Sequence, residues 1–384
     1  MRFLSFSTAG AHCMRILHVL RAPVGGLFRH VLDLAAEQAK RGHDVGILAD
    51  SNAEDRLTGP KFAALAPALK LGIIRLAMSR QPGLGDFNAG RLVFAHARTL
   101  SLDVLHGHGS KGGAYARLAA RQLRKQGQPV KAFYTPHGGS LNYKPGSLQS
   151  FIFLKAERAL ERLTDGLIFE SAYAARVYAE RVGKGPTPKR IIPNGLQPQD
   201  FELRELTPDA SDFLFIGELR AIKGVDVFLD ALAQLNRDRR VTATIVGSGP
   251  DANRLAMQAA KLGLTDVTKF TGALPARQAF GLGRIMVVPS LAESFPYVVL
   301  EAAAAQLPLI STNAGGIPEI VEGTDTALIE PADADALAAA MGLALDRFDA
   351  AVAKSQRLRA NVESKFTVAG MTSEILDFYA SARR

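Results

Sequence analysis

The sequence has one cysteine, no tryptophan and no long apolar run, and each shortage excludes a class of protein. A single cysteine, Cys13, excludes a disulfide framework and is typical of a reducing compartment. No apolar stretch approaches the roughly 20 residues that a membrane-spanning helix needs. Without tryptophan, the 20 phenylalanines indicate core packing rather than a platform for nucleic-acid bases. The chain is nevertheless long and apolar, since 384 residues that are 47% hydrophobic suffice for two well-buried domains.

Positive charge is concentrated in the first half of the chain. Residues 1–200 carry 28 lysines and arginines against 14 acidic residues, whereas residues 201–384 carry 18 against 23. In residues 117–125 the cations recur at helical spacing, which is typical of a solvated helix face and also of contact with an anionic membrane surface. Nucleic acid is the other usual partner of a basic chain, but no helix-turn-helix, zinc or aromatic-platform pattern is present. We therefore expect no nucleic-acid partner.

Strand-like runs alternate with helical patterns along the chain, and the alternation restarts at Phe213. This order predicts an α/β protein with two doubly wound, parallel-sheet, Rossmann-like domains. The polar stretch 197–209, which contains two prolines, is the predicted linker, so the domains are expected over 14–198 and 199–365. The first strand is expected to start at Met14. Residues 1–13 are then an extension, too short and polar for a signal peptide, to which we assign no function.

Two carboxylates, Glu293 and Glu301, enclose the predicted start of a helix. Residues 285–290 have the pattern of a buried strand, and Ser294 with Pro296 is typical of the beginning of a helix. Backbone N–H groups and the positive end of the helix dipole would suit a diphosphate there. Judged by spacing alone, a pair of exposed acids at a helix end is an equally good interpretation.

The segments before and after this helix start favour a diphosphate site over a pair of exposed acids. Upstream, the strand-like run 213–216 ends at Gly217 and is followed by Arg220 and Lys223, which would neutralise a leaving diphosphate. Alone, these two cations would be interpreted as solvated loop charges. Downstream, Gly315 and Gly316 lie in a strand-to-helix turn where the backbone must approach something closely. The combination is much more specific than any of its parts.

With these motifs the sequence resembles the retaining, nucleotide-sugar-dependent glycosyltransferases of family 4 (glycosyl transferases group 1). Members of this family have the GT-B fold, in which two domains face each other across a cleft. The resemblance runs from about Met14 to the C-terminus. It rests on five motifs: an E-x7-E pair at Glu293 and Glu301, Lys223-Gly224, a G-G-x-P-E turn at 315–319, Gly25-Gly26, and His137-Gly138.

The sequence departs from the family pattern at two positions. Many members have arginine where this chain has Glu218, so we assign that role to Arg220. Many also have glycine where Pro296 stands, which removes one backbone N–H from the expected phosphate site. The phosphate would then depend on the amides of Phe295, Tyr297 or Val298.

The resemblance implies transfer of a hexose from a UDP- or GDP-sugar to an acceptor hydroxyl with retention. It implies no metal and no other cofactor, and no D-x-D motif follows a suitable strand. Arg220 and Lys223 would stabilise the leaving diphosphate, Glu293 the sugar hydroxyls, and His137 would contact the transferred sugar. Glu301 would hold a ribose, and the nucleobase would lie near residues 272–274. The expected donor-binding residues are Glu301, Gly217, Gly272, Leu274, Ser294, Phe295, Pro296, Tyr297 and Val298.

The first domain would bind the acceptor. Gly25 and Gly26 follow the first strand and precede a helix expected near Phe28, and with His108 and Lys111 they form the expected acceptor or phosphate loop. A plain tight turn is the alternative for the glycines. A helix over about 366–384 would pack back onto this domain, as in family members. The basic half suggests a glycan or lipid-linked acceptor and a peripheral position on the cytoplasmic face of a membrane.

Several other interpretations remain open. Residues 247–252 look like a dinucleotide fingerprint, which would indicate an NAD-dependent oxidoreductase, but Pro250 intrudes. Glu293 and Glu301 could be the paired acids of a glycosidase, which would leave Arg220 and Lys223 unexplained. A GT-B sugar-nucleotide epimerase would use the same donor clamp. A metal site is disfavoured for three histidines that follow strands, because they lack helical i, i+4 pairing and cysteine partners: His106, His108 and His137.

Overall fold

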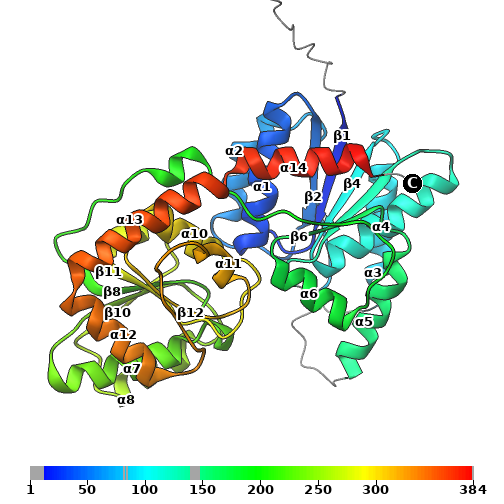
Figure 1. Cartoon of the computed structure of the whole chain (residues 1–384). Helices are drawn as coiled ribbons and strands as arrows, with labels where there is room; N and C mark the ends of the chain where they lie inside the picture. Colours follow the sequence, from blue (N-terminus) through cyan, green and yellow to red (C-terminus); the bar gives the residue numbers. More distant parts are fainter. Residues whose placement is uncertain (1–12, 81–82, 84, 139–147, 383–384) are drawn as a thin grey trace, which may run out of the picture. The chain divides into compact units, whose positions relative to one another are not determined.

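The computed structural model describes residues 13–80, 83, 85–138 and 148–382. The chain divides into two compact units. The first comprises residues 1–169, 177–190 and 372–384, and the second comprises residues 170–176 and 191–371. Each unit is built on its own parallel sheet, which is the predicted α/β architecture (Figure 1). No helix in the described residues is long and apolar enough to cross a bilayer.

The first unit contains a seven-stranded sheet of order β3-β2-β1-β4-β5-β6-β7. Its inner strand β1 is apolar from Ile16 to Leu20 except at His18, because helices cover both faces of the sheet. One apolar cluster joins the sheet to α1, and a second joins it to α3 and α4. The strands are β1 Arg15–Leu20, β2 Asp44–Asp50, β3 Gly72–Leu76, β4 Val104–His108, β5 Lys131–Thr135, β6 Gly166–Phe169 and β7 Lys189–Ile191. The helices are α1 Gly25–Lys40, α2 Thr58–Leu65, α3 Gly85–Ala97, α4 Gly109–Lys125 and α5 Leu148–Glu161. A further helix, α6 Ala172–Arg181, begins in the second unit and ends in the first.

The second unit contains a six-stranded sheet of order β10-β9-β8-β11-β12-β13. Separate apolar clusters again line the two faces of the sheet. The strands are β8 Ser211–Ile216, β9 Ala243–Val246, β10 Thr268–Gly272, β11 Gly283–Val288, β12 Leu309–Thr312 and β13 Leu328–Ile329. The helices are α7 Val225–Asp238, α8 Ala252–Lys261, α9 Ala276–Ala279, α10 Tyr297–Ala304, α11 Ile317–Val321, α12 Ala334–Asp346 and α13 Phe348–Lys365.

Each sheet has a point where the strand order reverses. In the first sheet β1 pairs in parallel with β2 on one side and with β4 on the other. In the second sheet β8 occupies the same position between β9 and β11. Open parallel sheets bind ligands outside the carboxyl ends of the strands at such a reversal. The topology therefore predicts ligand-binding residues in the loops after β1 and β4 in one unit and after β8 and β11 in the other.

The division of the chain differs in detail from the bounds expected from sequence. The units separate after Arg190 rather than near residue 198, and Leu196 bridges to Thr367 inside the second unit. The last helix, α14 (Val368–Ser381), joins the first unit from residue 372 onward. There the Lys131 ammonium donates to the carbonyl of Tyr379 at 2.7 Å. Pairing between distant segments sets these boundaries, and composition does not reveal it.

Candidate active site

A lysine and a glutamate meet where the second sheet reverses its strand order. Lys223 ends a short 3-10 turn after β8, and Glu293 lies in the loop after β11. The Lys223 Nζ atom is 2.6 Å from Glu293 Oε1, and the Ser290 hydroxyl donates to the same oxygen at 2.8 Å. The Leu291 amide, which donates to the carbonyl of Ile222 at 2.8 Å, joins the two loops. The topology thus brings together two residues that are 70 positions apart in the chain.

Glycines allow these loops to pack closely against one another. Gly224 has φ +65°, and a Cβ atom there would lie 2.0 Å from the carbonyl oxygen of Pro289. Gly315 has φ +61°, and its Cβ would lie 1.6 Å from the carbonyl oxygen of Glu293. A Cβ on Gly316 would lie 2.1 Å from the carbonyl oxygen of Ser294. The close approach expected at Gly315 and Gly316 is therefore an approach to the backbone that carries Glu293.

The last residue of the G-G-x-P-E turn has a structural partner. The Glu319 carboxylate accepts hydrogen bonds from the amides of Ala172 and Tyr173 at 2.7 and 2.8 Å. These amides begin α6, so a carboxylate here satisfies open N–H groups and complements the helix dipole. Glu319 therefore fastens the turn after β12 to the residues that follow β6.

The helix after β11 begins at Tyr297, with Pro296 in the N-cap position. Sequence analysis gave Ser294 a role in starting this helix, and the structure corrects that expectation. The Ser294 hydroxyl donates instead to Glu170 Oε1 at 2.6 Å, and the helix has no side-chain cap. The Phe295 and Tyr297 side chains are buried and that of Val298 is half-buried, so a ligand there would meet the backbone amides of these residues.

Glu301 lies about one turn into α10, closer to its start than the two turns expected from sequence. It lines a cavity of about 170 Å³ together with Arg204, Arg277 and Phe280. Leu274 follows the end of β10 at Gly272, and it packs on the same apolar cluster as Phe280. The expected ribose and nucleobase residues thus come from neighbouring segments of the second unit.

Arg220 is a weaker feature of the site than Lys223. It is half exposed and lies 3.4 Å from Glu218 Oε2, a geometry that contributes little in water. The preceding loop, which starts at Gly217, supports the turn that resembled a dinucleotide fingerprint. A Cβ on Gly247 would lie 1.8 Å from the Gly217 carbonyl oxygen, and one on Gly249 would lie 2.3 Å from that of Leu219. These glycines therefore serve packing between two loops.

Only some residues of the expected acceptor loop in the first unit are exposed to solvent. α1 begins at Gly25 rather than near Phe28, and Gly25 and Gly26 are both exposed at its uncapped start. Lys111, by contrast, is held by Asp86 Oδ1 and by the carbonyl of Ser79, each at 2.7 Å.

The helix that carries Lys111, α4, presents only part of the basic face expected for residues 117–125, since Arg121 and Lys125 are exposed. Arg117 is fully buried, with its guanidinium 4.0 Å from the Tyr134 ring centroid and 2.8 Å from Glu157 Oε2. Arg124 pairs with Asp165. The expectation was wrong for Arg117, because α4 packs this side against β5 and α5.

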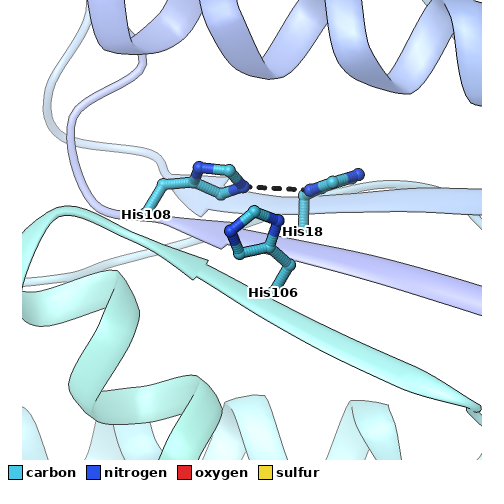
Figure 2. A group of neighbouring side chains, drawn as sticks. All are labelled: His18, His106 and His108. Atoms are coloured by element: carbon cyan, nitrogen blue, oxygen red, sulfur yellow. Dashed lines mark hydrogen bonds between the residues drawn. The ribbon is translucent and has the colours of Figure 1, made fainter. Parts of the chain in front are cut away.

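Histidines gather at the strand reversal of the first sheet. His106 and His108 lie within β4 rather than beyond its end, and both are buried (Figure 2). His18 of β1, which sequence analysis missed, lies 3.0 Å from His108 through its Nδ1 atom. His137 follows β5 with φ +50°, is partly exposed, and lies 3.2 Å from His108 Nδ1. A polar residue inside the apolar run of β1 was the signal that could have revealed His18.

Burial controls the charge of these histidines. It lowers the pKa of His18 to about 4 and that of His137 to about 3, and it lowers the pKa values of His106 and His108 well below the ordinary value. All four are therefore neutral near pH 7, because desolvation disfavours the imidazolium form.

The same imidazoles come close enough together to be considered as metal ligands. Two groups of three place nitrogen atoms within 4.8 Å of one another: His18, His106 and His108, and His30, His108 and His137. Neither group includes a carboxylate, so a buried divalent ion would lack compensating charge. Most of the nitrogens concerned are also hydrogen-bonded to neighbouring groups. The geometry favours a hydrogen-bonded cluster over a metal centre.

Comparison with known proteins places the chain in a family. Residues 24–200 match the family model described as Glycosyltransferase Family 4, and residues 210–347 match Glycosyl transferases group 1. The glycogen synthase of Mycobacterium tuberculosis is 30% identical over 392 aligned residues, which cover 94% of this chain and 92% of that protein. The MMP alpha-(1->4)-mannosyltransferase of Mycolicibacterium hassiacum is 24% identical, with 84% and 86% covered.

A solved structure has the same fold. The crystal structure of Anabaena HepE in complex with UDP and glucose superposes with a TM-score of 0.80 at 20% identity, covering 96% of this chain and all of that one. The two Rossmann-like sheets and the full-length sequence similarity agree on the assignment. The chain belongs to the family 4 glycosyltransferases and has the GT-B fold.

Proposed function

We propose that this glycosyltransferase transfers a hexose from a nucleoside diphosphate sugar to an acceptor hydroxyl with retention of the anomeric configuration. The pairing of Lys223 with Glu293 at the strand reversal of the second sheet carries the proposal. The HepE crystal structure with UDP and glucose supports a nucleotide-sugar donor, and the glycogen synthase relative supports a glycan acceptor.

The two charged groups have separate tasks in the proposed reaction. Negative charge develops on the leaving diphosphate, and Lys223, helped by Arg220 and the amides that begin α10, stabilises it. Glu293 accepts hydrogen bonds from hydroxyls of the transferred sugar. In the structure described here, Glu293 Oε1 holds the Lys223 ammonium in place, and fixed charges cost little reorganisation during the reaction. Glu301 binds the ribose in this proposal.

The named relatives are a glycogen synthase and a mannosyltransferase, which favours transfer over the epimerase alternative. Product analysis distinguishes the two, since an epimerase converts the nucleotide sugar without an acceptor. A thermal-shift panel of UDP- and GDP-sugars first identifies the donor, because a ligand that binds the folded state raises apparent stability by mass action.

With the donor identified, Glu293→Gln tests the site directly. The substitution keeps the size of the side chain and removes its charge, so kcat/KM is expected to fall at least about tenfold through the loss of a charge-assisted hydrogen bond. Asp325→Asn is the matched control, because it makes the same change in the exposed pair with Arg357, where N and O are 2.6 Å apart. Equal activity of both variants would remove Glu293 from the site.

The proposed reaction needs no metal, because Lys223 and Arg220 supply the positive charge. Transfer is expected to continue at an unchanged rate in excess EDTA, with EDTA presaturated with Mg²⁺ as the control. Complete loss of activity that Mg²⁺ restores would show that the two cations do not suffice.

A further inference from the structure

A line of hydrogen bonds connects α1 to the histidine that follows β5. Gln38 Oε1 lies 2.8 Å from His18 Nε2, His18 Nδ1 lies 3.0 Å from His108 Nε2, and His108 Nδ1 lies 3.2 Å from His137 Nε2. Figure 2 shows the central link between His18 and His108. Gln38, His18 and His108 are buried, whereas His137 is partly exposed. The line thus leads from the interior of the first unit toward its surface.

A line of neutral imidazoles transmits the direction of its first hydrogen bond. A neutral imidazole has one N–H donor and one lone-pair acceptor, so the role of one nitrogen determines the role of the other. The Gln38 amide oxygen only accepts, which makes His18 Nε2 the donor and His18 Nδ1 an acceptor. His108 must then donate from Nε2 and accept at Nδ1. His137 in turn donates from Nε2, which leaves the lone pair of its ring on Nδ1.

The direction depends on which end of the Gln38 amide faces His18. In the structure the amide oxygen faces His18, and the buried amide nitrogen has no hydrogen-bond partner among the described residues. His106 lies outside the line, because its two nitrogens face Tyr379 Oη at 2.6 Å and Thr135 Oγ1 at 2.9 Å.

We propose that Gln38 is a positioning residue that acts through His18 and His108 to fix the tautomer of His137, so that Nδ1 of His137 accepts a hydrogen bond from a hydroxyl of the transferred sugar. The proposal rests on the proposed function for the sugar contact. The tautomer itself follows from the hydrogen bonds alone. A fixed tautomer removes the fraction of molecules in which a protonated Nδ1 of His137 would face the hydroxyl proton of the sugar.

Nitrogen-15 NMR of histidine-labelled protein reads the tautomers without any substitution, since protonated and lone-pair ring nitrogens differ in chemical shift. His18, His108 and His137 are each expected to carry the proton on Nε2. A proton on Nδ1 of His137 overturns the proposal. In Gln38→Met, which keeps the length of the side chain and removes the acceptor, His137 is expected to show a mixture of tautomers.

Kinetics tests whether Gln38 acts through His137. Gln38→Met is expected to lower kcat/KM for the donor about fivefold, the effect of one hydrogen bond, and to cause no further loss in the His137→Ala background. Thr135→Val is the matched control, because it removes a buried bond of His106 beside the line and is expected to leave both kcat/KM and the His137 tautomer unchanged.

Losses that add in the double variant overturn the proposal, as does an unchanged His137 spectrum in Gln38→Met. Failure of the proposed function has a different signature. Wild-type protein would then transfer sugar from no nucleotide donor, while the NMR spectrum would still decide the tautomer.

Discussion

The buried histidines of the first unit make the free energy of unfolding depend on pH. Burial lowers the pKa of His18 from 6.5 to about 4, so below pH 6.5 the unfolded chain binds a proton that the folded chain excludes. Stability is therefore complete above about pH 6.5 and falls as the pH drops toward 4. His18 alone contributes on the order of 3 kcal/mol over this range.

Urea unfolding at pH 7.5, 6 and 5 measures this dependence, which is expected to be smaller in His18→Asn because that variant has one titrating group fewer. His106 and His108 pack against His18, Tyr379 packs against His106, and these rings share the same desolvated environment. A stability that is constant from pH 7.5 to 5 would show that water reaches these rings.

At the scale of elements, the position of the loop after β11 depends on the turn after β12. Gly315→Ala is expected to lower both stability and activity, because its Cβ would lie 1.6 Å from the carbonyl oxygen of Glu293. The positive φ alone costs about 1–2 kcal/mol for alanine. Gly263→Ala is the matched control, because Gly263 has φ +72° and nothing within 4 Å of its Cβ.

Urea unfolding and transfer assays of both variants separate the two effects. Gly263→Ala is expected to lose stability only, whereas Gly315→Ala also loses turnover. If both variants lose the same stability and keep full turnover, the glycine contact does not position Glu293.

Helix α4 shows how packing changes the meaning of a periodic pattern. Its cations recur at helical spacing in the sequence, but the spacing does not tell which side of the helix faces the sheet. Arg117 lies on the packed side, where Glu157 and the Tyr134 ring compensate its charge, and Arg121 and Lys125 lie on the exposed side. A helical repeat therefore identifies one face of a helix, and the elements that pack against the helix decide whether that face is exposed to solvent.

For the whole molecule, we propose from the uneven charge of the sequence that the protein binds peripherally to an anionic membrane that presents the acceptor. Each cation near anionic lipid contributes about 1 kcal/mol, so Arg121→Glu combined with Lys125→Glu is expected to weaken binding at least about tenfold. Co-sedimentation with anionic vesicles at low salt measures this. Lys261→Glu, an exposed reversal in the second unit, is expected to have no effect.

Higher salt is expected to release the protein, because exposed charges are screened within about 10 Å at 0.1 M ionic strength. Equal binding to neutral and anionic vesicles, or no binding to either, would favour a soluble acceptor.

The sequence by itself determined the α/β architecture, the two sheets and the family, because hydrophobic periodicity and short motifs are local properties. It also singled out Lys223 and Glu293 individually. Their contact, and the approach of Gly315 to the Glu293 backbone, depend on which strands lie side by side. The line from Gln38 to His137 joins α1, β1, β4 and the loop after β5, and the sequence did not reveal it either. Only the tertiary structure decides such contacts, because parallel strands bring together residues whose distance along the chain carries no information about their distance in space.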